Sequence, residues 1–432
     1  MHDVGALSPI AWLISISIKA ITVFTVTLVA VALFTLLERR ISAWIQDRLG
    51  PNRVGPFGLL QPIADGVKNI LKEETYPGAA SRMFFVLAPM FSITPAMITM
   101  AVVPLAAPLP TPWGLVEMIV ADLPIGILYV LALTSLGVYG LVMAGWASNN
   151  KYALLGGLRA SSQMVSYEVA MGLSLIPIFM LAGNVTLTQI VWTQQEGVGL
   201  WLAFPLALSF LIFMLAAFAE TNRLPFDMPE AESELVSGFH TEYSSMKFSM
   251  FMIGEYANMT TASALMATLF LGGWDIPFTS WDNMRVVAPG VVEGAAPSVL
   301  KTLVTLAVFA VKTLFFVFFF MWVRWTVPRF RYDQIMHLGW KILLPTALGY
   351  ITLIGSTILV LDALQVPMGL VYGLVLTAVS VVSLLLFLWL VDRDRVMAGS
   401  SYTSARRIRA AGITIERETA DVVGAGEESS WR

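Results

Sequence analysis

The chain has 432 residues, of which 57% are hydrophobic and only 13% are charged, and its formal net charge is −3 at pH 7. So apolar a composition excludes an ordinary soluble globular protein. The chain also contains no cysteine, which excludes a disulfide bond and iron–sulfur ligation by this chain.

Nine segments are apolar enough, over the roughly 20 residues that a bilayer requires, to be membrane-spanning helices. They are Ile10–Leu37, Met83–Leu105, Ile125–Trp146, Met164–Leu181, Leu200–Ala219, Met250–Leu271, Leu303–Trp325, Ile342–Leu361 and Met368–Leu390. The first is too long and too uniformly apolar for a cleavable signal peptide. The sequence therefore predicts an all-α, polytopic membrane domain over residues 1–391, with about nine transmembrane helices.

The first loop reads ERRISAWIQDRLGPNRVGPFGLLQPIADGVKNILKEE from Glu38 onward. Gly50–Pro56 has the composition of a turn, because proline fixes φ and glycine accepts unusual backbone angles. After it, apolar residues recur at helical spacing from Leu59 to Leu71, with Asp65 and lysines on the other side. This pattern predicts an amphipathic helix, which forms either a plain charged surface helix or a doorway at the level of the lipid.

The third loop leads into GGLRASSQMVSYE, in which Glu168 falls about one turn inside the next span. A carboxylate at that depth requires a partner or a proton. The alternative is an interfacial glutamate that extends to water, although the glutamate side chain is short.

The fifth loop concentrates carboxylates between two apolar spans in AETNRLPFDMPEAESELVSGFHTEY. Asp227 and Glu230 have the spacing of a helix capping box. Carboxylates so close together should titrate as a coupled set, some with raised pKa values, and could store and move protons. An acidic helix that faces water is the alternative. The acidic series is Glu220, Asp227, Glu230, Glu232, Glu234, Glu242 and, in the next span, Glu255, with Arg223 among them.

The seventh loop, WVRWTVPRFRYDQIMHLGWK, contains Arg324, Arg329 and Asp333 and by itself indicates only an ordinary cationic and aromatic membrane interface. Of the 26 Lys and Arg residues, Lys19 and Lys312 lie inside spans and only Arg285 and Lys301 lie in even-numbered loops. We therefore expect the odd-numbered loops and the C-terminus to face the cytoplasm and the N-terminus to face out. Residues 392–432 are rich in Arg, Gly and Ser and predict a disordered cytoplasmic tail.

Three histidines, His2, His240 and His337, lie far apart without the spacing of metal ligands, so we expect no metal or haem held by this chain. Redox chemistry would have to use electrons from another protein.

Taken in order, the four odd-numbered loops closely resemble those of the H subunits of bacterial NADH–quinone oxidoreductases, respiratory complex I, which are equivalent to mitochondrial NADH dehydrogenase subunit 1. The matching stretches are ERRISAWIQDRLGPNRVGPFGLLQPIADGVK, GLRASSQMVSYE, AETNRLPFDMPEAESELVSGFHTEY with GEYANM, and VPRFRYDQIMHLGWK, over roughly residues 35 to 345. The family has a core of eight spans, so the ninth span and the tail of this chain are departures from it.

The resemblance implies a multi-pass subunit of a proton-translocating enzyme in the bacterial cell membrane, which forms the membrane side of the quinone tunnel. Ubiquinone or menaquinone would be the substrate, while NADH, FMN and iron–sulfur clusters would be bound by partner subunits; nucleic acid is not an expected partner. Carried over residue by residue, the tunnel would involve Glu38, Arg39, Arg48, Asp65, Arg324, Arg329 and Asp333. The proton relay would involve Glu168, Glu220, Arg223, Asp227, Glu230, Glu232, Glu234, Glu242 and Glu255.

Two other functions remain open on the sequence. A homologous ion-translocating subunit of a membrane-bound hydrogenase would share the acidic loop but would need no quinone. An independent secondary transporter is disfavoured, because transporters usually show internal repeats and mid-membrane binding sites, whereas we find no repeat and the acids cluster towards one side.

Overall fold

The computed structural model describes residues 2–3, 7–228, 238–277 and 279–393. The chain divides into two compact units, Met1–Leu384 and Leu385–Arg432. The cavities and side-chain clusters described below are built from residues of the first unit. The tail expected at residues 392–432 falls almost wholly outside the described residues.

Among the described residues, seven helical segments are long and apolar enough to cross a bilayer. They are α1 (Pro9–Ile45), α3 (Arg82–Ile98) continued by η2 (Thr99–Val102), α4 (Gly126–Ala147), α5 (Lys151–Ala182), α9 (Val299–Thr326), α10 (Tyr332–His337) continued by η4 (Leu338–Leu343) and α11 (Leu344–Ala363), and α12 (Leu370–Arg393). These segments correspond to seven of the nine predicted spans and confirm a helical, polytopic membrane protein.

Two further helices occupy the positions of the fifth and sixth predicted spans. Helix α7 (Ala207–Glu220) is apolar but has only 14 residues. Helix α8 (Ser245–Phe270) has 26 residues, and polar side chains such as Glu255 and Thr261 interrupt its apolar sequence. Most of α8 beyond Gly254 is buried, so its polar groups face protein and not lipid. The remaining short helices are η1 (Pro56–Gly58), α2 (Gln61–Leu71), α6 (Leu187–Trp192) and η3 (Thr193–Gly197).

Two small antiparallel sheets were not predicted. Strands β2 (Ala106–Thr111) and β3 (Gly114–Met118) form a hairpin, while β1 (His2–Asp3), β4 (Met284–Ala288) and β5 (Val291–Gly294) pair in the order β1-β5-β4. The register places Thr111 opposite Gly114 and His2 opposite Val292. Strands of two to six residues, one of them containing prolines, give too little alternation for a sequence pattern to detect.

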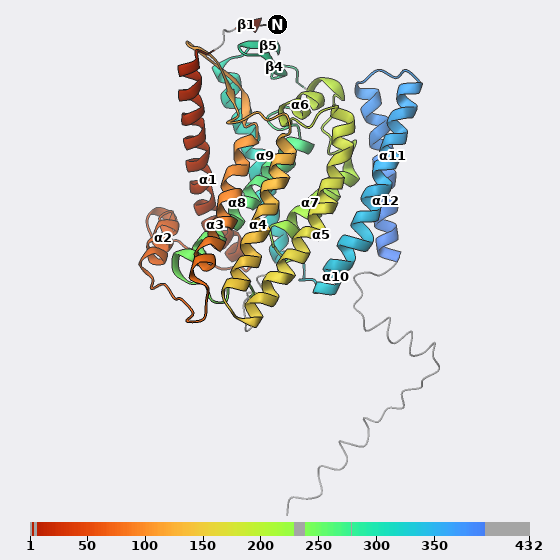
Figure 1. Ribbon diagram of the computed structural model, residues 1–432. Coiled ribbons are helices and arrows are strands. Elements are labelled where there is room, and N and C mark those ends of the chain that lie inside the picture. Colours follow the sequence, from red (N-terminus) through yellow and green to blue (C-terminus); the bar gives the residue numbers. More distant parts are fainter. Residues whose placement is uncertain (1, 4–6, 229–237, 278, 394–432) are drawn as a thin grey trace, which may run out of the picture. The chain divides into compact units, whose positions relative to one another are not determined.

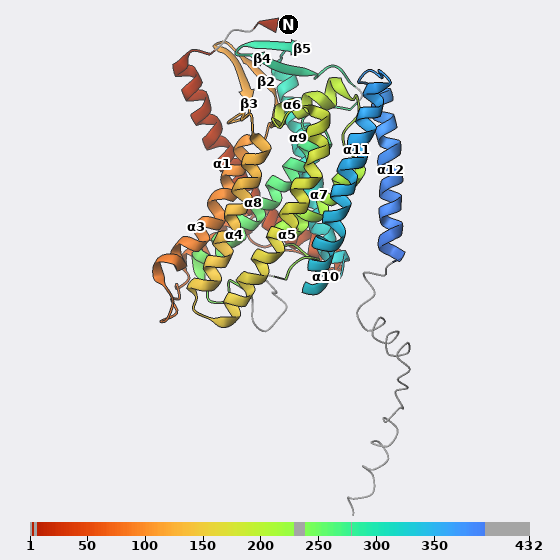
Figure 2. The same ribbon diagram turned by 45° about the vertical axis from the view of Figure 1, so that its right-hand side comes forward.

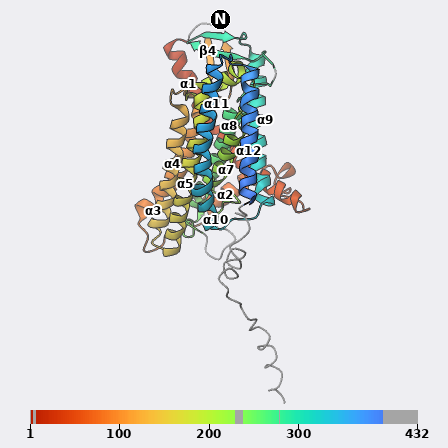
Figure 3. The ribbon, with the colours of Figure 1, turned by 90° about the vertical axis from the view of Figure 1, so that its right-hand side faces the viewer.

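The connections fall at two opposite ends of the helix bundle (Figures 1 and 3). Helices α2 and α10 lie at one end, here called the α2 end, and strands β4 and β5 lie at the other, the sheet end. This is the alternation that successive spans require. The distribution of basic residues predicts that the α2 end faces the cytoplasm, and this orientation remains a prediction.

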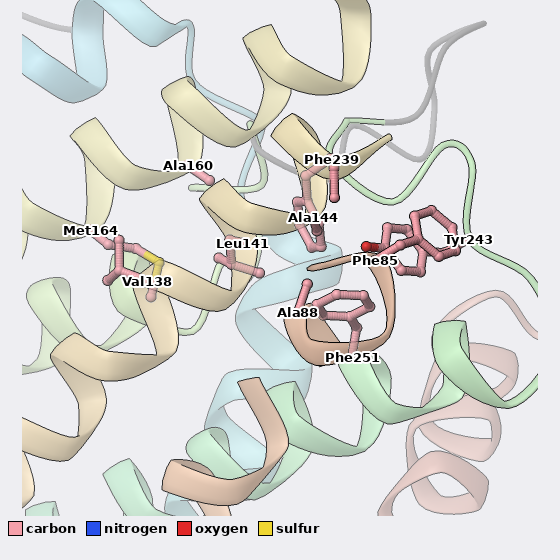
Figure 4. Packing of buried hydrophobic residues seen from close by; sticks show 11 residues of the cluster. Phe85, Ala88, Val138, Leu141, Ala144, Ala160, Met164, Phe239, Tyr243 and Phe251 are labelled. Carbon is pink, nitrogen blue, oxygen red and sulfur yellow. The ribbon is translucent and has the colours of Figure 1, made fainter. Parts of the chain in front are cut away.

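A hydrophobic cluster near the α2 end packs α3, α4, α5 and α8 around the second half of the fifth loop (Figure 4). Phe85 of α3 stacks on Tyr243 with their ring centroids 4.0 Å apart. Burial raises the pKa of Tyr243, which keeps this ring neutral inside the cluster. The cluster thereby fixes the loop that joins α7 to α8 against the helices around it.

Helix α5 approaches this loop closely at a glycine. A Cβ atom on Gly156 would come within 2.7 Å of the backbone of Gly238, closer than side chains tolerate. Gly156 therefore serves close packing of α5 against the fifth loop.

Candidate functional site

A buried cluster of charges connects α1, α8, α9 and the fifth loop near the α2 end. Arg223 Nη1 donates to both carboxylate oxygens of Glu38, at 3.0 and 2.8 Å. Arg324 of α9 forms a second ion pair with Glu38. The Tyr256 hydroxyl donates to Glu38 Oε2 at 2.6 Å. Glu38 therefore accepts hydrogen bonds from three side chains while its own side chain is only 6% exposed.

Arg223 joins this group to a second carboxylate. Its Nε lies 2.5 Å from Glu255 Oε1, and its guanidinium lies 4.3 Å from the centre of the Tyr256 ring. Burial acts to lower the pKa of Arg223, but Glu255 and Glu38 outweigh burial and hold the pKa well above its ordinary value. The charges of two arginines thus balance those of two carboxylates. A proton added to either carboxylate leaves a net positive charge, which changes the electrostatic energy of the neighbouring groups.

The lengths of the elements bring these residues together. Helix α1 has 37 residues, about 55 Å of helix, whereas a bilayer core takes about 30 Å. Glu38 lies on the last two turns of α1, close to where α7 ends and the fifth loop begins. Glu255 and Tyr256 follow on the third turn of α8. The cluster therefore sits just inside the α2 end of the bundle.

A cavity of about 620 Å³ lies beside the cluster. Its wall combines apolar residues with the charged ones and comes from α1, α2, α8, the end of α9 and the fifth loop. The lining residues include Leu28, Val31, Thr35, Glu38, Arg39, Asp65, Ile70, Arg223, Met252, Glu255, Tyr256, Arg324 and Trp325. A chamber with a mostly apolar wall and a few converging polar groups at one place has the character of a small-molecule site.

Helix α2 forms one wall of this cavity and is only lightly attached. Each residue of α2 is at least partly exposed. Arg39 of α1 forms an ion pair with Asp65 of α2, with Nη1 2.6 Å from Oδ2. At the other end of α2, the Ser245 hydroxyl donates to the carbonyls of Asn69 and Lys72, at 2.8 and 2.9 Å. This is the amphipathic helix that the first loop predicted.

Beyond Glu255, acidic residues continue into the bundle. Glu255 and Glu220 both line a small cavity of about 30 Å³, large enough for a water molecule. Glu220 forms a side-chain hydrogen bond with Thr134, and the adjacent Ser135 donates to Glu168. Glu220 and Glu168 thus contact adjacent residues of α4 and interact electrostatically with each other, and the series runs from Glu38 through Glu255 and Glu220 to Glu168.

Four of the seven expected tunnel residues, Glu38, Arg39, Asp65 and Arg324, line the large cavity. Arg329 instead donates from Nη2 to the carbonyl oxygen of Asp227 at 2.8 Å, so it ties the seventh loop to the fifth. The side chains of Arg48 and Asp333 are exposed, away from the cavity wall.

The expected relay residues are also divided. Glu168, Glu220, Arg223 and Glu255 belong to the connected series described above, whereas Glu242 accepts a hydrogen bond from Asn150 Nδ2 at 2.7 Å. The helix expected after the capping box, with Glu230, Glu232 and Glu234, falls on residues 229–237, outside the described residues. Within the described ranges, no group of three or more His, Asp or Glu side chains is arranged to hold a metal.

Sequence reasoning missed Tyr256, which contacts both Glu38 and Arg223. The available signal was its position directly after Glu255 in GEYANM, inside a matching stretch. It also missed that Glu38 and Arg223 belong to one cluster, because sequence spacing carries no information about contacts between distant segments.

Comparison with known proteins identifies one family. The family model for NADH dehydrogenase matches residues 18–355. An NADH-quinone oxidoreductase H subunit of Geobacter metallireducens is 48% identical over 350 residues, which cover 81% of this chain and 98% of that protein. An H subunit of the same kind from Cytophaga hutchinsonii is 46% identical over the same shares of both chains. The H subunit of Leptospira biflexa is 47% identical over 78% of this chain and 92% of that protein.

Proposed function

The chain belongs to the family of NADH-quinone oxidoreductase H subunits, and from that membership we propose that it forms the membrane side of a quinone tunnel and couples quinone reduction to proton translocation. The observation that carries the proposal is the joint location of the large cavity and the Glu38–Arg223–Glu255 cluster. The apolar residues of the cavity wall would accept an apolar molecule. The charged residues of the same wall would respond to a change of charge inside the cavity.

The apolar part of the wall suits the isoprenoid chain of a quinone, because that chain is stabilised by leaving water or headgroups for an apolar surface. Leu28, Val31, Met252 and Ile253 supply such a surface along α1 and α8. Arg39 and Asp65 form an ion pair between two elements of the wall, α1 and α2, so quinone that enters from the bilayer between these elements would pass beside this pair.

The charged part of the wall suits coupling. Reduction of a quinone to a quinol takes two electrons and two protons. The electrons would come from an iron–sulfur cluster in a soluble partner protein, because this chain contains no cysteine. Uptake of protons by the reduced quinone would change the balance of charge between the two carboxylates and the two arginines of the cluster. Glu255 would then exchange a proton with Glu220 through a water in the small cavity between them.

Beyond Glu220, the change of charge would act on Glu168, because these two carboxylates interact electrostatically and contact the adjacent residues Thr134 and Ser135 of α4. Neighbouring membrane subunits would receive it there. We place the α2 end at the cytoplasmic face of the bacterial cell membrane, where the basic residues of the odd-numbered loops are expected. The names of the relatives favour this function over that of a hydrogenase-type complex, since each of them is called an NADH-quinone oxidoreductase subunit.

Photoaffinity labelling tests the tunnel. The assembled complex is irradiated with an azido-quinone, and labelled peptides are identified by mass spectrometry. We expect label on α1, α2 and α8 residues of the cavity wall, and loss of that label when excess unmodified quinone competes. Label that is confined to other helices, or that competition leaves unchanged, would overturn the proposal.

A further inference from the structure

The first half of α1 packs only loosely against the rest of the chain. Every residue from Pro9 to Val26 is exposed or half-buried, and the buried residues of α1 begin at Thr27. Figure 2 shows this half at the edge of the bundle, near β2 and β3. Because the segment is strongly apolar, lipid or another chain must cover it in the membrane.

A cavity of about 590 Å³ lies between this half of α1 and the segment Leu115–Asp122. Helix α1 contributes Trp12, Ser15, Ile16 and Lys19, whose spacing of three or four residues puts them on one face. The opposite face, with Ile14 and Ile18, is also exposed. This cavity, here called the wedge, therefore lies beside a helix that has apolar surface on both sides.

Three ionisable groups face the wedge. Lys19 Nζ donates to the carbonyls of Glu117 and Ile119, at 3.1 and 2.7 Å, and an ammonium group has a third N–H to offer. The Glu117 and Asp122 carboxylates both line the wedge, and Asp122 Oδ2 accepts a hydrogen bond from Thr188 at 3.0 Å. The same two carboxylates also line a smaller neighbouring cavity together with Arg285, although among the described residues no ion pair joins Arg285 to either of them.

Within the wedge itself, the single cation Lys19 therefore faces two carboxylates. Burial raises the pKa of Glu117, and the nearby Asp122 adds to that rise while Lys19 opposes it. Burial raises the pKa of Asp122 as well. Glu117 is half-buried whereas Asp122 is exposed. The cost of ionisation therefore lies mainly in the burial of Glu117 and in the repulsion between the two carboxylates, and a second cation between them would be stabilised.

The wedge lies at the level of lipid headgroups. Lys19 precedes Arg39 by 20 residues, which is about 30 Å of helix and equals the thickness of a bilayer core. If Arg39 lies at one headgroup level, Lys19 lies near the other. Trp12 is 55% exposed at the mouth of the wedge, as expected of an aromatic residue at the membrane interface.

We propose that this wedge binds a phospholipid whose headgroup carries a primary ammonium group. The ammonium lies between Glu117 and Asp122, the phosphate accepts the remaining N–H of Lys19, and an acyl chain covers the unpacked half of α1. A choline headgroup cannot donate hydrogen bonds and a glycerol headgroup has no cation, so neither satisfies the carboxylates. The site is at the opposite end of the bundle from the Glu38 cavity and does not depend on the quinone proposal.

Site-specific photocrosslinking in the assembled complex tests the site. A benzophenone amino acid replaces Ile16 in the wedge or, as a matched control, Ile14 on the other face of α1. The complex is reconstituted in phosphatidylcholine vesicles that contain equal minor amounts of phosphatidylethanolamine and phosphatidylglycerol. At position 16 we expect the ethanolamine lipid to exceed the glycerol lipid in the adducts by about tenfold, which corresponds to about 1.4 kcal/mol. At position 14 we expect their ratio to be near one.

The double substitution Glu117→Gln with Asp122→Asn should reduce the ratio at position 16 to that at position 14. Glu293→Gln, which alters a carboxylate at the same end but outside the wedge, should leave it unchanged. Equal adducts of both minor lipids at position 16 in the otherwise unaltered complex would overturn the proposal. An adduct with a partner protein at that position would also overturn it, because a protein helix would then fill the wedge.

Discussion

Glu38 and Arg223 are separated by 185 residues in the chain, yet they form a buried ion pair with two hydrogen bonds. Their side chains are 6% and 3% exposed. Through this pair the end of α1, which forms the cavity wall, is tied to the loop that precedes α8. A change of charge at the cavity is therefore also a change at the beginning of the acidic series.

Removal of Arg223 should destabilise the protein strongly. Arg223→Met leaves Glu38 with one arginine, Arg324, and the Tyr256 hydroxyl, and it leaves Glu255 buried without its arginine. Breaking a buried pair in this way typically costs about 3–5 kcal/mol. We expect less assembled complex on native gels and a lower thermal unfolding midpoint. Arg331→Met, at an exposed site on the seventh loop, should match the unaltered complex. A normal yield and midpoint for Arg223→Met would contradict this account of the cluster.

The ion pair between Arg39 and Asp65 should affect quinone entry. Asp65→Arg places two cations across the cavity wall and should raise the KM for quinone, while the exchanged pair Arg39→Asp with Asp65→Arg should restore it in part. Partly exposed pairs contribute about 0.2–1 kcal/mol, so the effect on KM should be up to about fivefold. NADH oxidation by an artificial acceptor, which takes electrons upstream, should stay normal.

Arg48 provides a comparison for that experiment. The resemblance places Arg48 with the tunnel residues, but its side chain is exposed away from the cavity wall. We expect Arg48→Ala to affect the KM for quinone less than Asp65→Asn does. A larger effect at Arg48 would mean that the quinone path extends beyond the cavity, along the surface on which a soluble partner docks.

The sequence predicted the helical fold because apolar segments of membrane-spanning length are an unambiguous signal. It did not predict β2 and β3, since short strands in a proline-containing loop give no clear alternation. Within the site, the matching motifs supplied Glu38, Arg223 and Glu255 individually. Their pairing could not be predicted, because it depends on the helix packing that brings α1 beside α8. The role of Gly156 could not be predicted either, because it depends on the close approach of the Gly238 backbone.

The loop after α2 should loosen in acid. Lys247 lies 2.7 Å from Glu74 and its Nζ lies 3.5 Å from the Tyr76 ring centre. Hydrogen bonds from Lys247 and then Tyr76 lower the pKa of Glu74. A lowered folded-state pKa gives a contribution to stability that is present above the ordinary value and is lost as the pH falls through the lowered one.

Limited proteolysis of the loop between α2 and α3 measures this effect. Cleavage in the unaltered protein should increase only in acid, whereas Glu74→Gln should be cleaved faster already at neutral pH. Glu73→Gln, which alters the adjacent exposed carboxylate, should keep the normal profile. Identical profiles for all three proteins would show that the Glu74–Lys247 pair does not hold this loop.

The central claim is that Glu255 and Glu220 carry the coupling between quinone reduction and proton movement. Its most direct test is paired measurement of quinone reductase turnover and proton uptake in reconstituted vesicles. We expect Glu255→Gln and Glu220→Gln each to lower both rates by about tenfold or more, which corresponds to about 1.4 kcal/mol or more in the barrier. Glu196→Gln, at an exposed site near the sheet end, should be nearly silent. Normal turnover and pumping by both the Glu255 and Glu220 variants would contradict the account, because the acidic series would then be structural only.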